Sequence, residues 1–216
     1  MRTEQRQTSS PGRPRGAADS RDRLLAAALA AFTRVGYEAA GLRAIADEAG
    51  CDVSMVAHHF GSKAGLWRAV VECVGQRHDL WLRDVIGLVN SKSPVADRLG
   101  ALADSMIDGL VDVPGYVSFV NRALAEPGER RDALVERVIR PGVETCTPLW
   151  REAMAAGVLR ALDPTVLHIG LFGACTMLLM MTDVCAELGG RALDVGDLKA
   201  ELRTLMLSGH VGRTPG

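Results

Sequence analysis

Apolar residues recur at helical spacing along most of the chain, and no segment shows the alternation typical of a strand. Between Leu25 and Val35 they repeat every three or four residues, and Gly36 follows where a helix commonly ends. The pattern predicts three short helices within residues 20–60 and a longer one over 63–89. Further helices are predicted over 94–111, 115–125, 129–157, 164–188 and 194–208. The predicted fold class is therefore all-α.

Composition divides the chain into three parts. Residues 1–18 are polar and rich in proline and glycine, which predicts a flexible basic arm that either lies along DNA or is a solvated tail. Residues 19–66 carry the short helices and form a predicted head, and residues 67–210 form a larger helical body. Inside the body, Pro141-Gly142 is expected to kink or split the helix over 129–157.

The charge balance changes along the chain. The 216 residues are 48% hydrophobic and 24% charged, as in ordinary globular proteins, and the net charge of −1 argues against a polycation that coats nucleic acid. Residues 1–68 nevertheless carry ten basic and seven acidic side chains, whereas the remainder is acidic overall. A basic front on an acidic remainder suggests two parts with different partners.

The sequence carries no recognisable catalytic or metal-binding motif. Its five cysteines are an odd number without a CxxC pair, which favours neither a disulfide framework nor a zinc site and fits a reduced, cytoplasmic setting. GxSxG, HExxH, phosphate-binding and dinucleotide-binding motifs are absent from the sequence. We expect no metal, no cofactor and no enzymatic activity. The alternative is an all-helical enzyme or a protein-interaction module that does not bind DNA.

One segment has the length of a short membrane span. Residues 165–182 contain no charged side chain, near the lower limit for a spanning helix. The segment stands alone and includes His168, Gly170 and Gly173. We therefore expect a buried core or interface helix and no membrane partner.

Two short helices joined at Gly50-Cys51-Asp52 have the size of a helix-turn-helix. Such a unit places its second helix in the DNA major groove, which is wide enough to admit it. Phe32, Ile45, Val56 and Phe60 are the apolar residues expected to form the core of the head. Their spacing leaves the remaining side chains of residues 53–59 for the surface.

The local sequence makes this pattern far more specific. Residues 24–66 read LLAAALAAFTRVGYEAAGLRAIADEAGCDVSMVAHHFGSKAGL. This segment closely resembles the DNA-binding head of the TetR family of bacterial transcriptional regulators. The residues that carry the resemblance are Ala31-Phe32, Gly36-Tyr37, Leu42-Arg43, Ile45-Ala46, Ala49-Gly50, His59-Phe60-Gly61-Ser62-Lys63 and Leu66.

The resemblance implies a three-helix helix-turn-helix head on a helical body that binds ligand and dimerises. It implies a homodimer on a pseudo-palindromic operator, which represses transcription until a small apolar or amphipathic molecule binds the body and moves the two heads apart. The last two helices of such proteins typically form a four-helix bundle across the dimer. We therefore expect dimerisation through 164–188 and 194–208, with ordinary intrachain core as the alternative for these apolar stripes.

Eight residues are expected to face DNA. Arg43 can bond guanine or a phosphate, although a surface pair with Asp47 is the alternative. Ser54 can bond a base edge or phosphate, and Val53 and Ala57 can touch a thymine methyl. Lys63, at a helix N-terminus, is expected to bind phosphate. The complete set is Arg43, Val53, Ser54, Met55, Ala57, His58, His59 and Lys63.

The head departs from the family pattern at three positions. Gly41 stands where the family usually has a capping Ser or Thr, so a hydroxyl contact to phosphate is lost. Ala57 stands where the family often has Tyr, which removes a second phosphate contact. Cys51 replaces a usual Val in the turn. These differences are expected to affect affinity for DNA and not the fold.

The body is expected to enclose a ligand pocket between about residues 94 and 182. Methionine and aromatic side chains suit an adaptable apolar cavity, although each also fits an ordinary core. Asn121 and His168 are the expected polar anchors. The candidate lining residues are Met106, Phe119, Asn121, Trp150, Met154, His168, Phe172 and Met177.

Overall fold

The computed structural model describes residues 16–112 and 115–207, and all regular elements in these ranges are helices. The helices are α1 Gly16–Ala39, α2 Leu42–Glu48, α3 Ser54–Phe60, α4 Lys63–Val89, α5 Val95–Val111, α6 Tyr116–Ala125, α7 Glu129–Leu134, a π-helical turn Val135–Ile139, α8 Arg140–Ala155, α9 Pro164–Met180, α10 Thr182–Gly189 and α11 Val195–Leu207. The predicted all-α class is confirmed.

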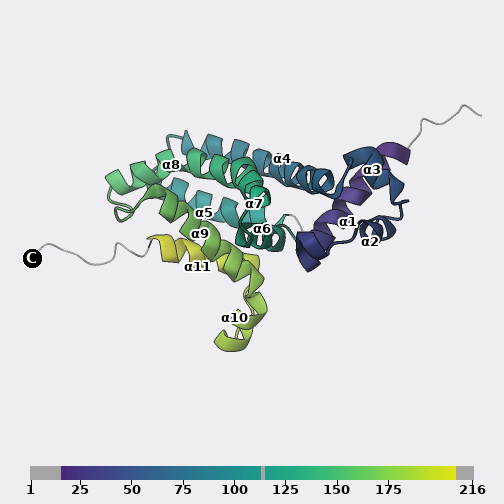
Figure 1. Ribbon diagram of the computed structural model, residues 1–216. Helices are drawn as coiled ribbons and strands as arrows, with labels where there is room; N and C mark the ends of the chain where they lie inside the picture. Colours follow the sequence, from purple (N-terminus) through teal and green to yellow (C-terminus); the bar gives the residue numbers. More distant parts are fainter. Residues whose placement is uncertain (1–15, 113–114, 208–216) are drawn as a thin grey trace, which may run out of the picture.

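A small head of α1, α2 and α3 lies at one end of an elongated body (Figure 1). Phe32, Ile45 and Val56 are buried in the head as predicted, and Phe60 is half-buried against them. Burial of each large apolar side chain contributes about 1.5–3 kcal/mol. Helix α4 spans 27 residues, about 40 Å at the usual rise, and runs from the head along the body. Head and body therefore share one continuous helix.

Both ends of the first predicted helix differ from the sequence pattern. Helix α1 begins at Gly16, so the last residues of the predicted arm over 1–18 are helical, and residues 1–15 lie outside the described part. Gly36 has a φ of +78°, which breaks the helix where the sequence indicated an end, but helical backbone resumes as far as Ala39. Gly36 therefore kinks α1 without terminating it.

The predicted helix over 129–157 is disturbed just before Pro141. Proline has no backbone N–H to donate to the carbonyl four residues earlier. The structure accommodates this loss with the π-helical turn Val135–Ile139, in which each hydrogen bond spans one more residue. The kink or split expected at Pro141-Gly142 is thus a widened helical turn between α7 and α8.

The predicted helix over 164–188 is two helices. α9 and α10 meet at Met181, whose φ of −119° is not helical, and their axes differ by 74°. No proline or glycine marks this break. Among the described residues, no single helix meets the length and hydropathy expected of a membrane span, although this bent pair does when taken together.

The apolar stripe predicted on 194–208 lies largely inside the chain. Leu198, Leu202 and Met206 are buried where α11 packs on α5, so they belong to the intrachain core. Leu171, on the predicted stripe of α9, is also buried. Helical spacing identified an apolar face correctly but did not reveal that the chain itself covers it.

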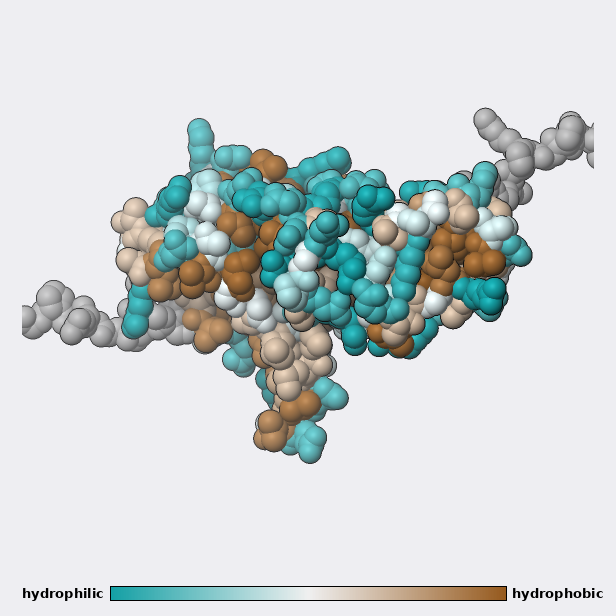
Figure 2. Space-filling view, viewed as in Figure 1, coloured by the Kyte–Doolittle hydropathy of each residue, from teal (hydrophilic) through white to brown (hydrophobic). Residues whose placement is uncertain are grey.

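A different face of α9 remains uncovered. Val166 is 65% exposed and Met177 is 55% exposed, and among the described residues a Cβ atom added at Gly170 or Gly173 would have no neighbouring atom within 4 Å. Helix α10 projects from the body and contains no buried residue, and apolar surface extends to its end (Figure 2).

Candidate functional site

The turn between α2 and α3 is held by local hydrogen bonds. Gly50 has a φ of +62°, a conformation that glycine adopts without strain, and the Cys51 N–H donates to the Ala46 carbonyl at 2.9 Å. The Asp52 carboxylate accepts the Ser54 backbone N–H at 2.8 Å, at the start of α3. Hydrogen bonds from Ser54 lower the pKa of Asp52.

The approach of α3 to α4 depends on one glycine. The Ser62 hydroxyl accepts the Gly65 N–H at 3.0 Å and caps α4. A Cβ atom at Gly65 would lie only 1.9 Å from the Phe60 carbonyl oxygen. Any other residue would therefore push the end of α3 away from α4 and change the angle at which α3 is presented.

One face of α3 is exposed. Val56 points into the head and is fully buried, whereas Val53, Ser54, Ala57 and His58 lie on the surface. Met55 is half-buried. Apart from His58, these exposed side chains are short, so another surface can approach α3 closely.

Arg43 lies on the surface of α2, next to α3 in the chain. Within the described residues its side chain makes no hydrogen bond or ion pair, so the alternative of a pair with Asp47 is not formed. Its guanidinium is available to an external acceptor.

His59 and Lys63 are engaged within the protein. His59 Nε2 lies 3.0 Å from the hydroxyl of Ser20 on α1. The Lys63 ammonium donates to the Glu38 carbonyl at 3.0 Å and lies 4.8 Å from the centre of the Tyr37 ring. Lys63 thus neutralises the carbonyl end of α1, a role that its position at the start of α4 did not reveal.

Head and body meet beside Tyr37. The Arg130 guanidinium stacks on this ring at 4.1 Å and donates to the Glu38 carboxylate at 3.0 Å. Trp67 of α4 and Phe119 of α6 pack together beneath, with ring centres 6.3 Å apart. A shift of α6 would therefore displace side chains that pack directly against α1 and α4.

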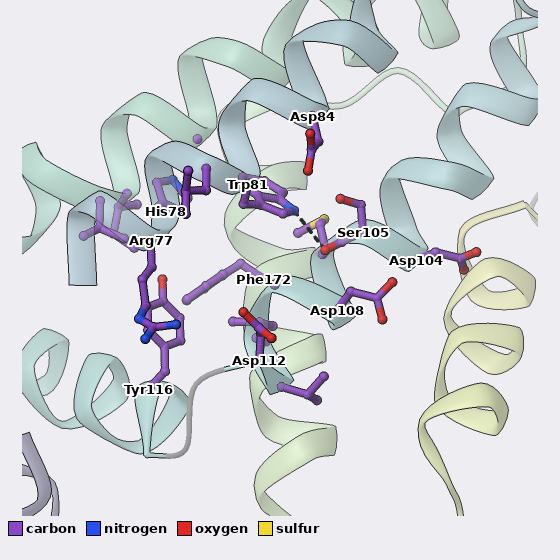
Figure 3. A pocket seen from close by; sticks show the side chains of 18 of the residues that line it. Arg77, His78, Trp81, Asp84, Asp104, Ser105, Asp108, Asp112, Tyr116 and Phe172 are labelled. Carbon is purple, nitrogen blue, oxygen red and sulfur yellow. Dashed lines mark hydrogen bonds between the residues drawn. The ribbon is translucent and has the colours of Figure 1, made fainter. Parts of the chain in front are cut away.

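The body contains a cavity of about 720 Å³, within the size range of small-molecule sites. Its walls come from α4, α5, α6, the π-helical turn, α8 and α9 (Figure 3). Trp81 lies on one wall, where its indole N–H donates to the Ser105 carbonyl at 2.9 Å, and Phe172 extends across the space. Tyr116 is buried, and burial raises the pKa of its hydroxyl to about 12. The Arg77 side chain extends toward Tyr116.

Two imidazoles converge inside this cavity. A Cβ atom at Gly142 would lie 3.4 Å from Nε2 of both His78 and His168. Burial lowers the pKa of each histidine to about 4, so both are neutral at pH 7. Within the described part of the chain, neither His78 Nε2 nor His168 Nδ1 has a hydrogen-bond partner.

Acidic side chains line the cavity toward α11. Asp104 forms an ion pair with Arg203, and Asp108 lies 2.5 Å from the Lys199 ammonium. Asp84 and Asp112 are exposed and form no ion pair with any described residue.

Three of the eight expected pocket residues line this cavity, namely Met106, His168 and Phe172. The other five lie elsewhere. Phe119 packs at the junction with the head, and the Asn121 amide donates to the Val117 carbonyl and the Met180 sulfur. Trp150 is fully buried beside His168, and Met154 is half-buried in the core. Met177 faces outward on α9. His78 and Trp81 were missed, although they lie three residues apart on one face of α4.

Residues 24–70 match the family model described as bacterial regulatory proteins of the tetR family. The chain is also 33% identical over 132 residues to the HTH-type transcriptional activator FasR of Mycolicibacterium smegmatis. That match covers 60% of this chain and 56% of FasR, so the chain spans little more than half of its relative.

Solved structures share the fold. One from Clostridium perfringens, described as a candidate fatty acid metabolism regulator, has a TM-score of 0.72 at 19% identity, covering 88% of this chain and all of that one. The fatty acid degradation regulator FadR of Bacillus halodurans has a TM-score of 0.68 at 17% identity, covering 94% of this chain and all of FadR. Residues 24–70 of this chain therefore match the tetR family of bacterial regulatory proteins, and the chain as a whole shares the fold of these solved structures.

Proposed function

We propose that this chain is a sequence-specific transcriptional regulator that binds DNA through α3 and is controlled by a small molecule in the body. The observation that carries the proposal is the exposed face of α3 opposite the buried Val56, within a head that matches the TetR family. An α-helix fits the major groove, and here α3 is held by α1, α2 and α4 with one face open. Because the proposed activity requires access to DNA, we propose that the protein acts in the cytoplasm.

The exposed side chains suit direct contact with DNA. The Ser54 hydroxyl can bond a base edge or phosphate, and Val53 and Ala57 can pack on thymine methyl groups. Arg43 can bond guanine in bidentate fashion or hold a phosphate. His58, which is exposed, is the better placed of the two histidines for a phosphate, because His59 already contacts Ser20.

TetR-family regulators bind operator DNA and act as dimers. For this chain we propose a homodimer on a pseudo-palindromic operator, with the two copies of α3 about 34 Å apart, one turn of DNA. The uncovered face of α9 supports this arrangement, because Val166 and Met177 are exposed and Gly170 and Gly173 allow close helix approach. The interface proposed over 164–188 and 194–208 would therefore rest mainly on α9 and the projecting α10.

The cavity is the proposed effector site, and an apolar or amphipathic molecule fits its aromatic walls. Helix α4 carries His78 and Trp81 at the cavity and Lys63 at the head, which gives the two regions a direct connection. An effector releases DNA only if it binds the DNA-incompetent arrangement more tightly. We propose that the chain represses transcription and that the effector relieves this repression. The relative FasR is named an activator. Expression of a reporter gene behind the operator, with and without the protein, distinguishes repression from activation.

Selection of bound fragments from sheared genomic DNA by the full chain tests this proposal. The matched control is Ala57→Glu, which places a carboxylate on the exposed face of α3 and repels phosphate. We expect the unmodified chain, and not the variant, to enrich fragments that carry an inverted repeat. Equal enrichment by both proteins, or none by a folded dimer even at low salt, would overturn the proposal.

A further inference from the structure

The inner part of the cavity is built around a missing side chain. Gly142 lies inside α8, where glycine costs about 1 kcal/mol relative to alanine. Its lack of a Cβ leaves open the space toward which His78 of α4 and His168 of α9 both turn Nε2. Three helices thus contribute to one small polar recess in an otherwise largely apolar site.

The recess offers neutral hydrogen-bonding groups. A neutral imidazole has one N–H donor and one acceptor nitrogen. His168 is 5% exposed, and within the described residues the buried His78 Nε2, which faces the recess, has no hydrogen-bond partner. The unpaired buried nitrogen of His168 is Nδ1, on the other side of its ring from the Nε2 that faces Gly142. Buried polar atoms are nearly always paired, which points to a partner that occupies the cavity. An uncharged oxygen can pair with such a nitrogen without bringing a charge into the interior.

The charges around the cavity disfavour an anion. Among the described residues, its lining includes four aspartates and one permanently charged basic side chain, Arg77. Lys199 and Arg203 lie outside the lining and are already paired with Asp108 and Asp104. A carboxylate in the recess would lose its hydration and gain only neutral donors, whereas buried charges require a compensating charge.

We propose that the cavity selects an uncharged, mainly apolar molecule whose carbonyl or hydroxyl oxygen lies between His78 and His168, and that it discriminates against the corresponding carboxylate. This inference rests on the proposed function only in taking the cavity as the effector site. Apolar walls alone would also admit a fatty acid anion. The proposed selection excludes such an anion and so distinguishes this site from a fatty acid site.

Direct binding of matched ten-carbon probes tests the selection. The full chain is titrated with 1-decanol, decanoate and decyltrimethylammonium, in the absence of DNA, by isothermal calorimetry at pH 7. We expect decanol to bind at least about tenfold more tightly than decanoate, corresponding to about 1.4 kcal/mol. Equal or tighter binding of decanoate, or tighter binding of the ammonium probe, would overturn the proposal.

Variants assign the selection to the recess and the acidic wall. His78→Phe with His168→Phe keeps an aromatic lining but removes the hydrogen bonds, and should weaken decanol binding at least about tenfold, the size expected for losing a satisfied buried pair. Asp84→Asn with Asp112→Asn removes two negative charges at exposed positions of the lining. This double variant should reduce the ratio of decanol affinity to decanoate affinity. Asp47→Asn on α2 lies in the head, outside the cavity, and should leave all three affinities unchanged.

The outcomes separate this inference from the proposed function. Unchanged decanol binding in the folded double-phenylalanine variant, or an unchanged preference in the double-asparagine variant, would refute it. Because the titrations contain no DNA, a failure to bind any operator would refute the proposed function while leaving the selection intact. Decanol that binds with the predicted selectivity but does not alter operator affinity would remove only the assignment of the cavity as effector site.

Discussion

Acid should destabilise this protein through His78 and His168. Each has an ordinary pKa of 6.5 in the unfolded chain and a pKa of about 4 in the folded one, because burial disfavours the charged imidazolium. Around His78, Asp79 opposes this lowering, whereas Arg137 and the other histidine reinforce it. As pH falls below 6.5, the unfolded chain takes up protons that the folded chain excludes, so stability present near neutral pH is lost toward pH 4.

The size of the effect follows from these two pKa values. Between about pH 7 and about pH 5, each histidine should lower the free energy of unfolding by about 2 kcal/mol, and the pair by about 4 kcal/mol. Domains of this kind are typically stable by only about 5–15 kcal/mol. Loss of the two contributions should therefore be plain in a urea unfolding curve.

The test compares urea unfolding of the unmodified chain with that of the double variant His78→Gln with His168→Gln, at both pH values. Glutamine remains polar but does not titrate, while an ion-paired carboxylate such as Glu136, whose pKa is lowered by Arg140 and by no histidine, contributes equally to both proteins. The variant should lose about 4 kcal/mol less between about pH 7 and about pH 5. An identical loss in the two proteins would refute the neutral, buried state of the histidines.

Three further substitutions test the head. Arg43→Ala should weaken operator binding by about 1–3 kcal/mol and relax preference at one base pair in a competition assay, and unchanged affinity would remove Arg43 from the interface. Lys63→Met should lower the slope of log affinity against log salt by about one if its ammonium also reaches a phosphate; an unchanged slope would restrict Lys63 to the Glu38 carbonyl. Gly65→Ala should lower the midpoint of thermal unfolding, because its Cβ would meet the Phe60 carbonyl oxygen, and an unaltered midpoint would contradict that contact.

The head was largely predictable because its constraints are local. Ile45 and Val56 lie at helical spacing around a glycine turn, and short helices joined by short turns leave few ways to bury them together. The sequence did not indicate that Lys63 folds back on Glu38, because that contact joins residues 25 apart.

The body was predictable only in outline. Helical periodicity found the apolar faces of α9 and α11 but not their partners, so the stripe at Leu198 and Leu202 proved to be intrachain core. The break at Met181 carries no glycine or proline that would mark it in the sequence. The cavity residues were missed because a ligand site mixes polar and apolar side chains. His78 and Trp81 are far from His168 in the sequence, and only the packing of different helices brings them to one cavity.

Sequence-specific binding through α3 is the central claim, and one competition measurement tests it most directly. A labelled inverted repeat taken from the genomic selection is bound to the full chain and displaced by the same repeat or by a duplex of equal composition with scrambled half-sites. The account predicts that the true repeat competes at least about a thousandfold better, as is usual for specific over non-specific binding, and that Ala57→Glu abolishes the difference. Equal competition by both duplexes would contradict it.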